Sequence, residues 1–313
     1  MQTTHKAVRI HQFGNAEVLA YEDAPMPVIA ADEVLVKIHA SSINPVDWKV
    51  REGYLKDFIP HTFPLILGWD FAGEIVALGA EVKDWQIGAA VYARPDIARD
   101  GAYAEYIAVR ANEIAAKPSS INWQEAAAVP LVALTAWQSL YEGANIQAGE
   151  RVLIHAGAGG VGSFAIQLAK LRGAHVITTT STANIALVKA LGADEVIDYT
   201  QTDFSALRDI DVVFDTMGGE IQDQSWQTLK RGGRLVSIIS QPSEETAAQA
   251  GVTPLFCFVQ PSAQQLTSLA ELIDAGKIKV TIDSVFALKD IAAAHAKSAT
   301  GRARGKIVIQ VSE

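Results

Sequence analysis

The stretch Arg151-Val-Leu-Ile-His-Ala-Gly157-Ala-Gly-Gly-Val-Gly162 decides the fold. An apolar strand runs into the pattern G-x-G-x-x-G, and a helix is predicted to follow over Val161–Leu171. Gly157 permits a tight turn, Gly159 lets the backbone approach a pyrophosphate, and Gly162 lets the helix pack close to the strand. The amides at the helix start, those of Gly160 and Val161 included, would hold the phosphates. In this context the pattern predicts a dinucleotide-binding turn. The alternative is a tight turn without a ligand.

Strands and helices alternate along the chain from Glu150 onward. The six candidate strands are Arg151–Ala156, Ala174–Thr179, Glu195–Asp198, Asp211–Asp215, Arg234–Ile239 and Leu255–Val259. Helices are predicted over Val161–Leu171, Ala183–Leu191, Ile221–Leu229, Ala263–Ala275 and Leu288–Ser298, and a last strand over Gly305–Val311. This alternation predicts an α/β fold with a parallel, doubly wound sheet, and six strands is the number that a full dinucleotide-binding fold uses.

The first hundred or so residues have a different pattern, of short strands separated by glycine and proline. The predicted strands are Val8–Ile10, Glu33–Ala40, Phe71–Leu78, Ile87–Ala93 and Ala102–Val109. Such spacing indicates an antiparallel sandwich or barrel. A helical stretch, Trp123–Tyr141, follows, and Pro130 should kink or divide it. The change of pattern near Asn122 indicates two domains, which also fits a length of 313 residues.

The composition excludes several classes of function and location. The formal net charge is −9, so the chain lacks the positive field that attracts nucleic acid or anionic lipid. Cys257 is the single cysteine, which excludes an intrachain disulfide and a thiolate metal cage. The first ten residues have no apolar segment of the secretory type, and the longest uncharged stretch is too short to span a bilayer. We therefore expect a soluble, cytoplasmic protein.

The end of the second strand of the predicted parallel sheet bears on the choice of cofactor. In an NAD site an acid about 20 residues after the turn accepts a hydrogen bond from the ribose. Here the next acid is Asp194, which is too far along, and the strand ends with Thr180 and Ser181. No carboxylate there would repel a 2′-phosphate and two hydroxyls could donate to it, so NADPH is predicted. The stretch has no basic residue, and Asn184 is uncharged. The alternative for each threonine is ordinary strand composition.

Five segments together carry a family resemblance. They are Ile43–Gly53, Leu67–Val76, Ala126–Ala136, the glycine turn and Gly305–Val308. In this order they resemble the medium-chain dehydrogenase/reductase superfamily, in its zinc-free quinone oxidoreductase branch, over essentially the whole chain. The resemblance implies a GroES-like, β-rich catalytic domain over residues 1–125 and 262–313. It implies a Rossmann dinucleotide-binding domain over residues 126–261.

The resemblance also bears on metal binding and on the substrate. Asn44 and Trp69 stand where zinc members carry a Cys and a His, and the seven histidines show no pair at ligand spacing on one helix, so no metal is expected. Asn44 would face the nicotinamide, or serve as a structural amide before Pro45. Tyr54 resembles a tyrosine near the substrate, or is a buried tyrosine that caps a hydrogen bond. Trp69 would form a flat apolar wall for an aromatic ring, or is plain core.

Cofactor contacts are implied at the remaining positions. Thr135 resembles a threonine near the nicotinamide ribose, and Ser181 and Tyr199 resemble residues near the 2′-phosphate. A ligand of a doubly wound sheet lies outside the carboxyl ends of its strands. This rule adds the residues that follow the fourth and fifth strands, namely Met217, Gly218, Ile239 and Ser240.

Together these features predict an NADPH-dependent reductase that transfers hydride to a quinone or an α,β-unsaturated carbonyl compound. Such acceptors are already electron-poor, so modest stabilisation of an oxyanion would suffice without zinc. A homodimer is implied by the resemblance, and neither nucleic acid nor membrane is an expected partner. One alternative is an NADPH-binding redox sensor or structural protein with little turnover. Another is an enoyl-thioester reductase, for which no basic cluster provides the required channel.

Overall fold

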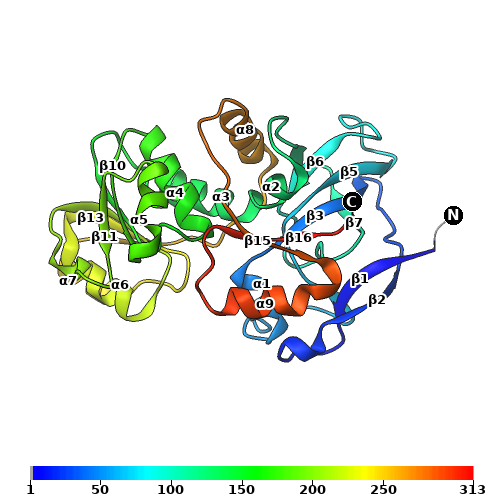
Figure 1. Cartoon of the computed structure of the whole chain (residues 1–313), viewed down its shortest axis with the longest axis horizontal. Helices are drawn as coiled ribbons and strands as arrows, with labels where there is room; N and C mark the ends of the chain where they lie inside the picture. The colour runs from blue at the N-terminus through cyan, green and yellow to red at the C-terminus, as the bar shows by residue number, and fades with distance from the viewer. Residues whose placement is uncertain (1–2, 313) are drawn as a thin grey trace. The chain divides into compact units, whose positions relative to one another are not determined.

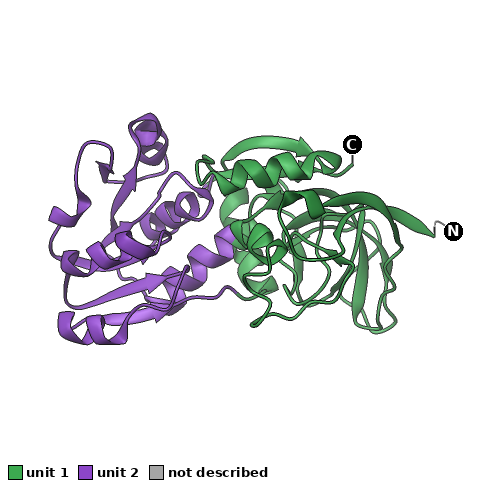
Figure 2. Ribbon diagram, turned by 90° about the horizontal axis from the view of Figure 1, so that it is seen from below, with its two compact units in different colours: residues 1–131, 260–276, 280–313 green, residues 132–259, 277–279 purple. Residues whose placement is uncertain are grey.

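The computed structural model describes residues 3–312, and they form two compact units, coloured green and purple in Figure 2. The first unit comprises the chain up to Leu131 together with Gln260–Gly276 and the chain from Val280 onward. The second comprises Val132–Val259 and Lys277–Lys279. Each unit has its own sheets and its own hydrophobic core.

A six-stranded parallel sheet forms the second unit, which confirms the predicted doubly wound architecture. Its strands are β9 (Arg151–Ile154), β10 (His175–Thr180), β11 (Glu195–Asp198), β12 (Ile210–Asp215), β13 (Leu229–Ser237) and β14 (Thr253–Phe256). Their order is β11-β10-β9-β12-β13-β14, and each neighbouring pair is parallel. The central strand β12 is buried along its whole length, as expected for a sheet with both faces covered.

Four helices connect these strands (Figure 1): α4 (Gly160–Leu171), α5 (Ile185–Ala190), α6 (Gly219–Ser225) and α7 (Glu244–Ala250). Helix α4 packs on β9 and β10, and α5 on β10 and β11. The sequence did not predict α7, because Ala247 is its only buried residue and no apolar stripe marks it. Its ends are nevertheless well defined. Ser243 accepts a hydrogen bond from Thr246 N, and Gly251 ends the helix with a φ of 67°.

Two β-sheets build the first unit. Its strands are β1 (Thr4–Ile10), β2 (Ala20–Pro25), β3 (Glu33–Ile43), β4 (Leu65–Ile66), β5 (Phe71–Leu78), β6 (Ala90–Ala93), β7 (Tyr106–Arg110), β8 (Ile114–Ala116), β15 (Ile282–Ala287) and β16 (Lys306–Gln310). One sheet has the order β2-β1-β4. The other has the order β15-β16-β3-β5-β6-β8, with β7 also paired to β3. Strand β16 thus lies between β15 and β3, although it is the last strand in the sequence.

Helices α1 (Pro45–Arg51), α2 (Trp123–Ala127), α8 (Ala263–Asp274) and α9 (Ile291–Ala299) belong to the first unit, and α3 (Pro130–Trp137) begins in it. Pro130 is the first residue of α3, so the prediction that it divides the helical stretch is confirmed. Proline lacks the N–H that a continuing helix would need. Short helical turns are η1 (Ala16–Val18), η2 (Gln138–Gly143), η3 (Thr182–Asn184), η4 (Phe204–Ala206), η5 (Trp226–Thr228) and η6 (Leu288–Asp290).

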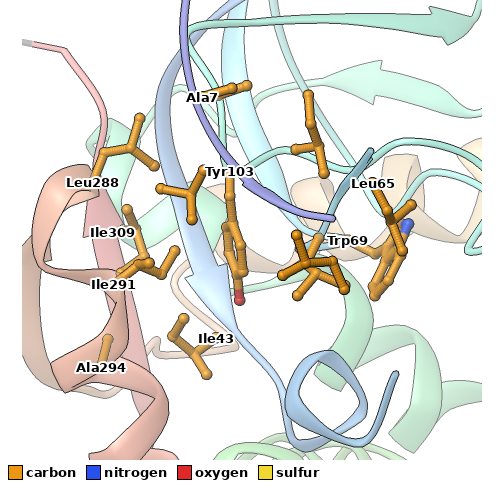
Figure 3. Close-up of a cluster of buried hydrophobic side chains, with 14 of the residues drawn as sticks. Ala7, Ile43, Leu65, Trp69, Tyr103, Leu288, Ile291, Ala294 and Ile309 are labelled. Atoms are coloured by element: carbon orange, nitrogen blue, oxygen red, sulfur yellow. The ribbon is translucent and has the colours of Figure 1, made fainter. Parts of the chain in front are cut away.

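Figure 3 shows a hydrophobic cluster of the first unit that joins residues from both ends of the sequence. Tyr103 lies in its middle, with Trp69 on one side and Ile291 and Ala294 of α9 on the other. The strand β16 contributes Ile309. The last helix and strand are therefore part of this core.

Candidate active site

The glycine turn of the second unit is shaped by contacts that exclude any larger residue. A Cβ atom at Gly157 would lie 2.0 Å from Thr178 Oγ1. A Cβ atom at Gly162 would lie 2.3 Å from the backbone oxygen of Ala156. Close packing of helix α4 on its strand therefore requires glycine at 162, as the sequence predicts, and close packing against Thr178 of β10 requires glycine at 157.

The same turn fits a pyrophosphate. Gly159 precedes α4, and no side chain caps the helix, so the first amides of α4 have no side-chain acceptor. A Cβ atom at Gly159 would approach only Ala156 O, at 3.3 Å, so the backbone is open there. A dianionic group would complement the free amides and the positive end of the helix dipole. Gly160 and Val161, in the first turn of α4, would contribute their amides.

A series of hydrogen bonds fixes the residue before this turn, Ala156, to β10 and α6. Ala156 has a φ of 52°, a left-handed conformation, and its N–H donates to Thr179 Oγ1 (3.1 Å). That hydroxyl contacts His155 Nδ1 (3.2 Å), and His155 Nε2 contacts Ser225 Oγ (2.9 Å). Burial lowers the pKa of His155 to about 4, so the ring is neutral at pH 7. With Thr179 donating to Nδ1 and Nε2–H donating to Ser225, every member of the chain has a partner.

The structure brings the other predicted cofactor residues of the sheet to the carboxyl ends of its strands. Thr180 ends β10, Ser181 follows it, and the exposed Tyr199 donates its N–H to Thr180 O (3.1 Å). Met217 and Gly218 follow β12, and the amides of both donate to the buried carboxylate of Asp215. Ile239 and Ser240 follow β13, and a Cβ atom at Gly218 would lie 2.7 Å from Ile239 Cγ2. The role of Thr135, which is buried on α3, stays a prediction.

Asp198 lies beside the predicted 2′-phosphate position, so the premise that no carboxylate is near it is wrong. Asp198 ends β11 and pairs in register with Thr180. Its carboxylate accepts hydrogen bonds from Thr182 Oγ1 (2.5 Å) and Thr200 Oγ1 (2.7 Å). Hydrogen bonds from these two threonines lower its pKa, so it is ionised at pH 7. The sequence argument followed one strand only, and the acid comes from the neighbouring strand, whose place depends on the strand order.

Asn44 is the centre of a buried polar site in the first unit. It lies between β3 and α1 and is fully buried. Its Nδ2 donates to Asp70 Oδ2 (2.7 Å), and its Oδ1 accepts from Lys306 Nζ (2.5 Å). Asp70 also accepts from Ser42 Oγ (2.8 Å) and from Leu131 N (2.7 Å). Sequence reasoning singled out Asn44 but missed Asp70 and Lys306, because a charge seen in sequence is usually solvent-exposed.

Asp47 is a second buried carboxylate of this site. Its Oδ2 accepts from Asn44 N (2.7 Å) and from the Tyr103 hydroxyl (2.6 Å), whereas its Oδ1 has no hydrogen-bond partner among residues 3–312. Burial raises the pKa of Asp47 to about 7, although the bonds from Tyr103 and Asn44 oppose the shift. The sequence offers no signal for this, since Asp47 reads as a local capping residue in a loop.

Tyr54 and Trp69 lie in very different surroundings. Tyr54 is 63% exposed and meets the ring of Trp48 edge-on, so the alternative of a buried tyrosine is wrong. Trp69 is fully buried in the cluster of Figure 3, and its Nε1 donates to Arg99 O (3.1 Å). Its indole has no open face, which supports the core-packing alternative over the apolar wall.

The described residues contain neither a metal-ligand cluster nor a membrane-spanning helix. Within residues 3–312, no three His, Cys, Asp or Glu side chains gather as a metal ion would require. Over the same residues, none of the helices combines the length and the apolar character needed to cross a bilayer.

Known proteins resemble this chain over nearly its whole length. The alcohol dehydrogenase GroES-like domain matches residues 30–119, and the zinc-binding dehydrogenase family matches residues 191–309. A mitochondrial NAD(P)H oxidoreductase of Danio rerio, RTN4IP1, is 34% identical over 100% of this chain and 92% of its own length. A 2-methylene-furan-3-one reductase of Solanum lycopersicum is 37% identical over 97% of this chain and 78% of its own length.

The solved structures agree with these relatives. The quinone oxidoreductase from Coxiella burnetii matches with a TM-score of 0.91 at 36% identity, covering 99% of this chain and all of that one. Along this chain, the GroES-like match lies in the β-rich first unit, and the dehydrogenase match begins within the parallel sheet of the second unit. The chain therefore belongs to the medium-chain dehydrogenase/reductase superfamily, in its zinc-free quinone oxidoreductase branch.

Proposed function

We propose that this oxidoreductase is a zinc-independent, NADPH-dependent reductase of quinones or α,β-unsaturated carbonyl compounds. The use of a nicotinamide cofactor follows from the family. The observation that carries the proposal is the Gly157–Gly162 turn, whose packing forbids a side chain at Gly157 and at Gly162 and whose helix start has no side-chain cap. When bound, the reduced cofactor supplies the hydride. The protein binds the cofactor, orients it toward the acceptor and polarises the acceptor.

The acceptor class is supported by chemistry and by the relatives' names. The polar site around Asn44 holds a neutral amide as its candidate hydrogen-bond donor. Such a site suits an acceptor that is already electron-poor. The Coxiella burnetii structure is named a quinone oxidoreductase, and the Solanum lycopersicum enzyme is named for a methylene group conjugated to a ketone. Asn44 is proposed to polarise the acceptor, and the exposed Tyr54 to lie near it.

NADPH preference is proposed on the hydroxyls of Thr180 and Ser181 at the end of β10, and Asp198 at the end of the neighbouring β11 opposes it. Thr135 and Tyr199 are proposed to contact the ribose and the adenine. We also propose a cytoplasmic homodimer. Phe256 lies on β14, which is an edge strand of the sheet, and it is half-exposed there. Such an edge can pair with a second copy.

The test follows nicotinamide absorbance with NADPH or NADH and 1,4-benzoquinone, 9,10-phenanthrenequinone or a simple enone, with and without a chelator. We expect turnover with NADPH that the chelator does not change. Turnover with NADH alone would overturn the cofactor assignment, and loss of activity in chelator would overturn zinc independence. Tight NADPH binding without turnover of any acceptor would favour the sensor or structural alternative.

A further inference from the structure

Lys306 places an ammonium ion deep inside the first unit. Strand β16 pairs with β3 so that Ile307 faces Ile43, which brings Lys306 next to Asn44. The residue is 3% exposed. Its Nζ donates to Ile43 O (2.9 Å), to Asn44 Oδ1 (2.5 Å) and to Asp70 Oδ2 (3.2 Å). An ammonium has three protons and no acceptor, and these three oxygens can take all three.

This ion decides which way the Asn44 side chain faces. The two ends of an amide have nearly the same shape, so charge must distinguish them. Lys306 can only donate and therefore binds the oxygen, while the carboxylate of Asp70 can only accept and therefore binds the nitrogen (2.7 Å). A flipped amide would turn its N–H groups toward the ammonium and its oxygen toward the carboxylate. Asn44 is thus held in a single orientation.

The fixed orientation leaves one donor free. Nδ2 carries two N–H groups, and its one hydrogen bond within the described chain goes to Asp70. The ammonium of Lys306 is buried beside the carboxylates of Asp70 and Asp47, and both carboxylates favour its charged form. Asn44 is fully buried, so the acceptor oxygen would have to come directly against this N–H, where a preorganised donor stabilises a developing oxyanion.

We propose that Lys306 is a positioning residue, whose ammonium ion holds the Asn44 amide with its nitrogen available to the acceptor oxygen. The proposal rests on the proposed reductase function, because it assigns Asn44 a partner in the acceptor. It also identifies a buried site for a primary ammonium ion, built from one backbone carbonyl, one amide oxygen and one carboxylate oxygen. Truncating Lys306 would empty this site without removing any of the three acceptors.

Lys306→Met and Lys306→Ala test the proposal in the full chain, with Lys279→Met, at an exposed lysine, as the matched control. Loss of the outer partner of a metal-ligating side chain costs about 10–100-fold in activity, and we take the same scale for the partner of Asn44. We expect kcat with a fixed enone to fall by that factor in both Lys306 variants and the KM for NADPH to stay unchanged. Methylammonium should restore kcat of Lys306→Ala saturably, whereas tetramethylammonium, which lacks N–H donors, should not.

Thermal unfolding separates this proposal from the proposed function. Methylammonium should raise the Tm of Lys306→Ala but not that of Lys279→Met, whether or not any acceptor is turned over. A normal kcat in a folded Lys306→Met, or no effect of methylammonium on either kcat or Tm, would overturn the proposal. If neither variant folds, neutron diffraction of the wild-type protein decides. Three deuterons on Lys306 Nζ with Asn44 Oδ1 facing them support it, and a neutral amine or a flipped amide refutes it.

Discussion

Ala156 adopts a backbone conformation that costs energy in any residue with a Cβ atom. Its φ is 52°, in the left-handed region, immediately before the glycine turn. We expect Ala156→Gly to stabilise the chain by about 1 kcal/mol, because glycine enters this region without the steric penalty. Urea unfolding measures the change. Ala186→Gly on the exposed face of α5 is the control, and it should destabilise by about 1 kcal/mol. Destabilisation by both variants would contradict the argument.

Asp47 should make stability depend on pH. Burial raises its pKa from 3.8 to about 7, so between these values the folded state binds a proton that the unfolded state has lost. Folding therefore becomes less favourable as pH rises from about 4 to about 7, and the loss is complete above pH 7. Asp47→Asn removes this titration and keeps an acceptor oxygen. As pH rises from 5 to 8, we expect the free energy of unfolding of Asp47→Asn to increase, relative to that of wild type, by on the order of a few kcal/mol. A Tm difference that is flat over this pH range would refute the assignment.

Asp198 should weaken the proposed preference for NADPH. Its ionised carboxylate, held by Thr182 and Thr200, lies beside Thr180, where a 2′-phosphate would bind. Removing the Asp198 charge relieves its repulsion of the 2′-phosphate. We expect Asp198→Asn to raise the ratio of kcat/KM for NADPH to that for NADH several-fold. Asp203→Asn, an exposed cap of η4 elsewhere in the same unit, should leave the ratio unchanged.

At the scale of elements, the junction of β9 and α4 tolerates no Cβ atom at Gly162. The atom would lie 2.3 Å from Ala156 O and 2.7 Å from Gly157 Cα, and backbone cannot yield as a side chain can. We expect Gly162→Ala to cost about 2 kcal/mol or more in stability through overpacking and to weaken NADPH binding. Thermal melts with and without NADPH measure both effects. Gly143→Ala is the control, since its Cβ would meet only Gln138 O, at 3.4 Å. Equal effects of the two variants would contradict the prediction.

Which elements could be predicted depends on what each one buries. The strands β9 and β12 are apolar runs buried on both faces, and both were found from sequence. Strand β2 was missed, because it lies at the edge of its sheet and has no alternation of apolar and polar residues. Its exposed positions include both Tyr21 and Asp23. The strand predicted from Ile87 begins only at Ala90, because Gly88 has a φ of 87° and belongs to the turn before it.

The candidate site also has one part that could be predicted from sequence and one part that could not. The glycine turn is local, so spacing alone reveals it. The environment of Asn44 is not local, because Asp70 and Lys306 reach it from 26 and 262 residues away in sequence. No pattern of charges along the chain marks such a pair, and only the pairing of β16 with β3 brings them together.

At the scale of the whole molecule, the first unit is completed by the last strand. Strand β16 lies inside a sheet, between β15 and β3, and carries Lys306 into the core. We expect a chain that stops at Gly305 to lose the fold of the first unit and to retain protection of Val132–Val259. Limited proteolysis followed by mass spectrometry measures this. Cleavage spread evenly over both units, or over neither, would contradict the prediction.

The position of β16 also sets an order of events during synthesis. The ribosome releases β3, Asn44 and Asp70 long before it releases residues 306–310. Until then, the carboxylate of Asp70 has no ammonium of Lys306 to pair with. All six strands of the parallel sheet have emerged by then, and domains generally fold as units during translation. The second unit should therefore fold first during synthesis, and the first unit should complete its fold last.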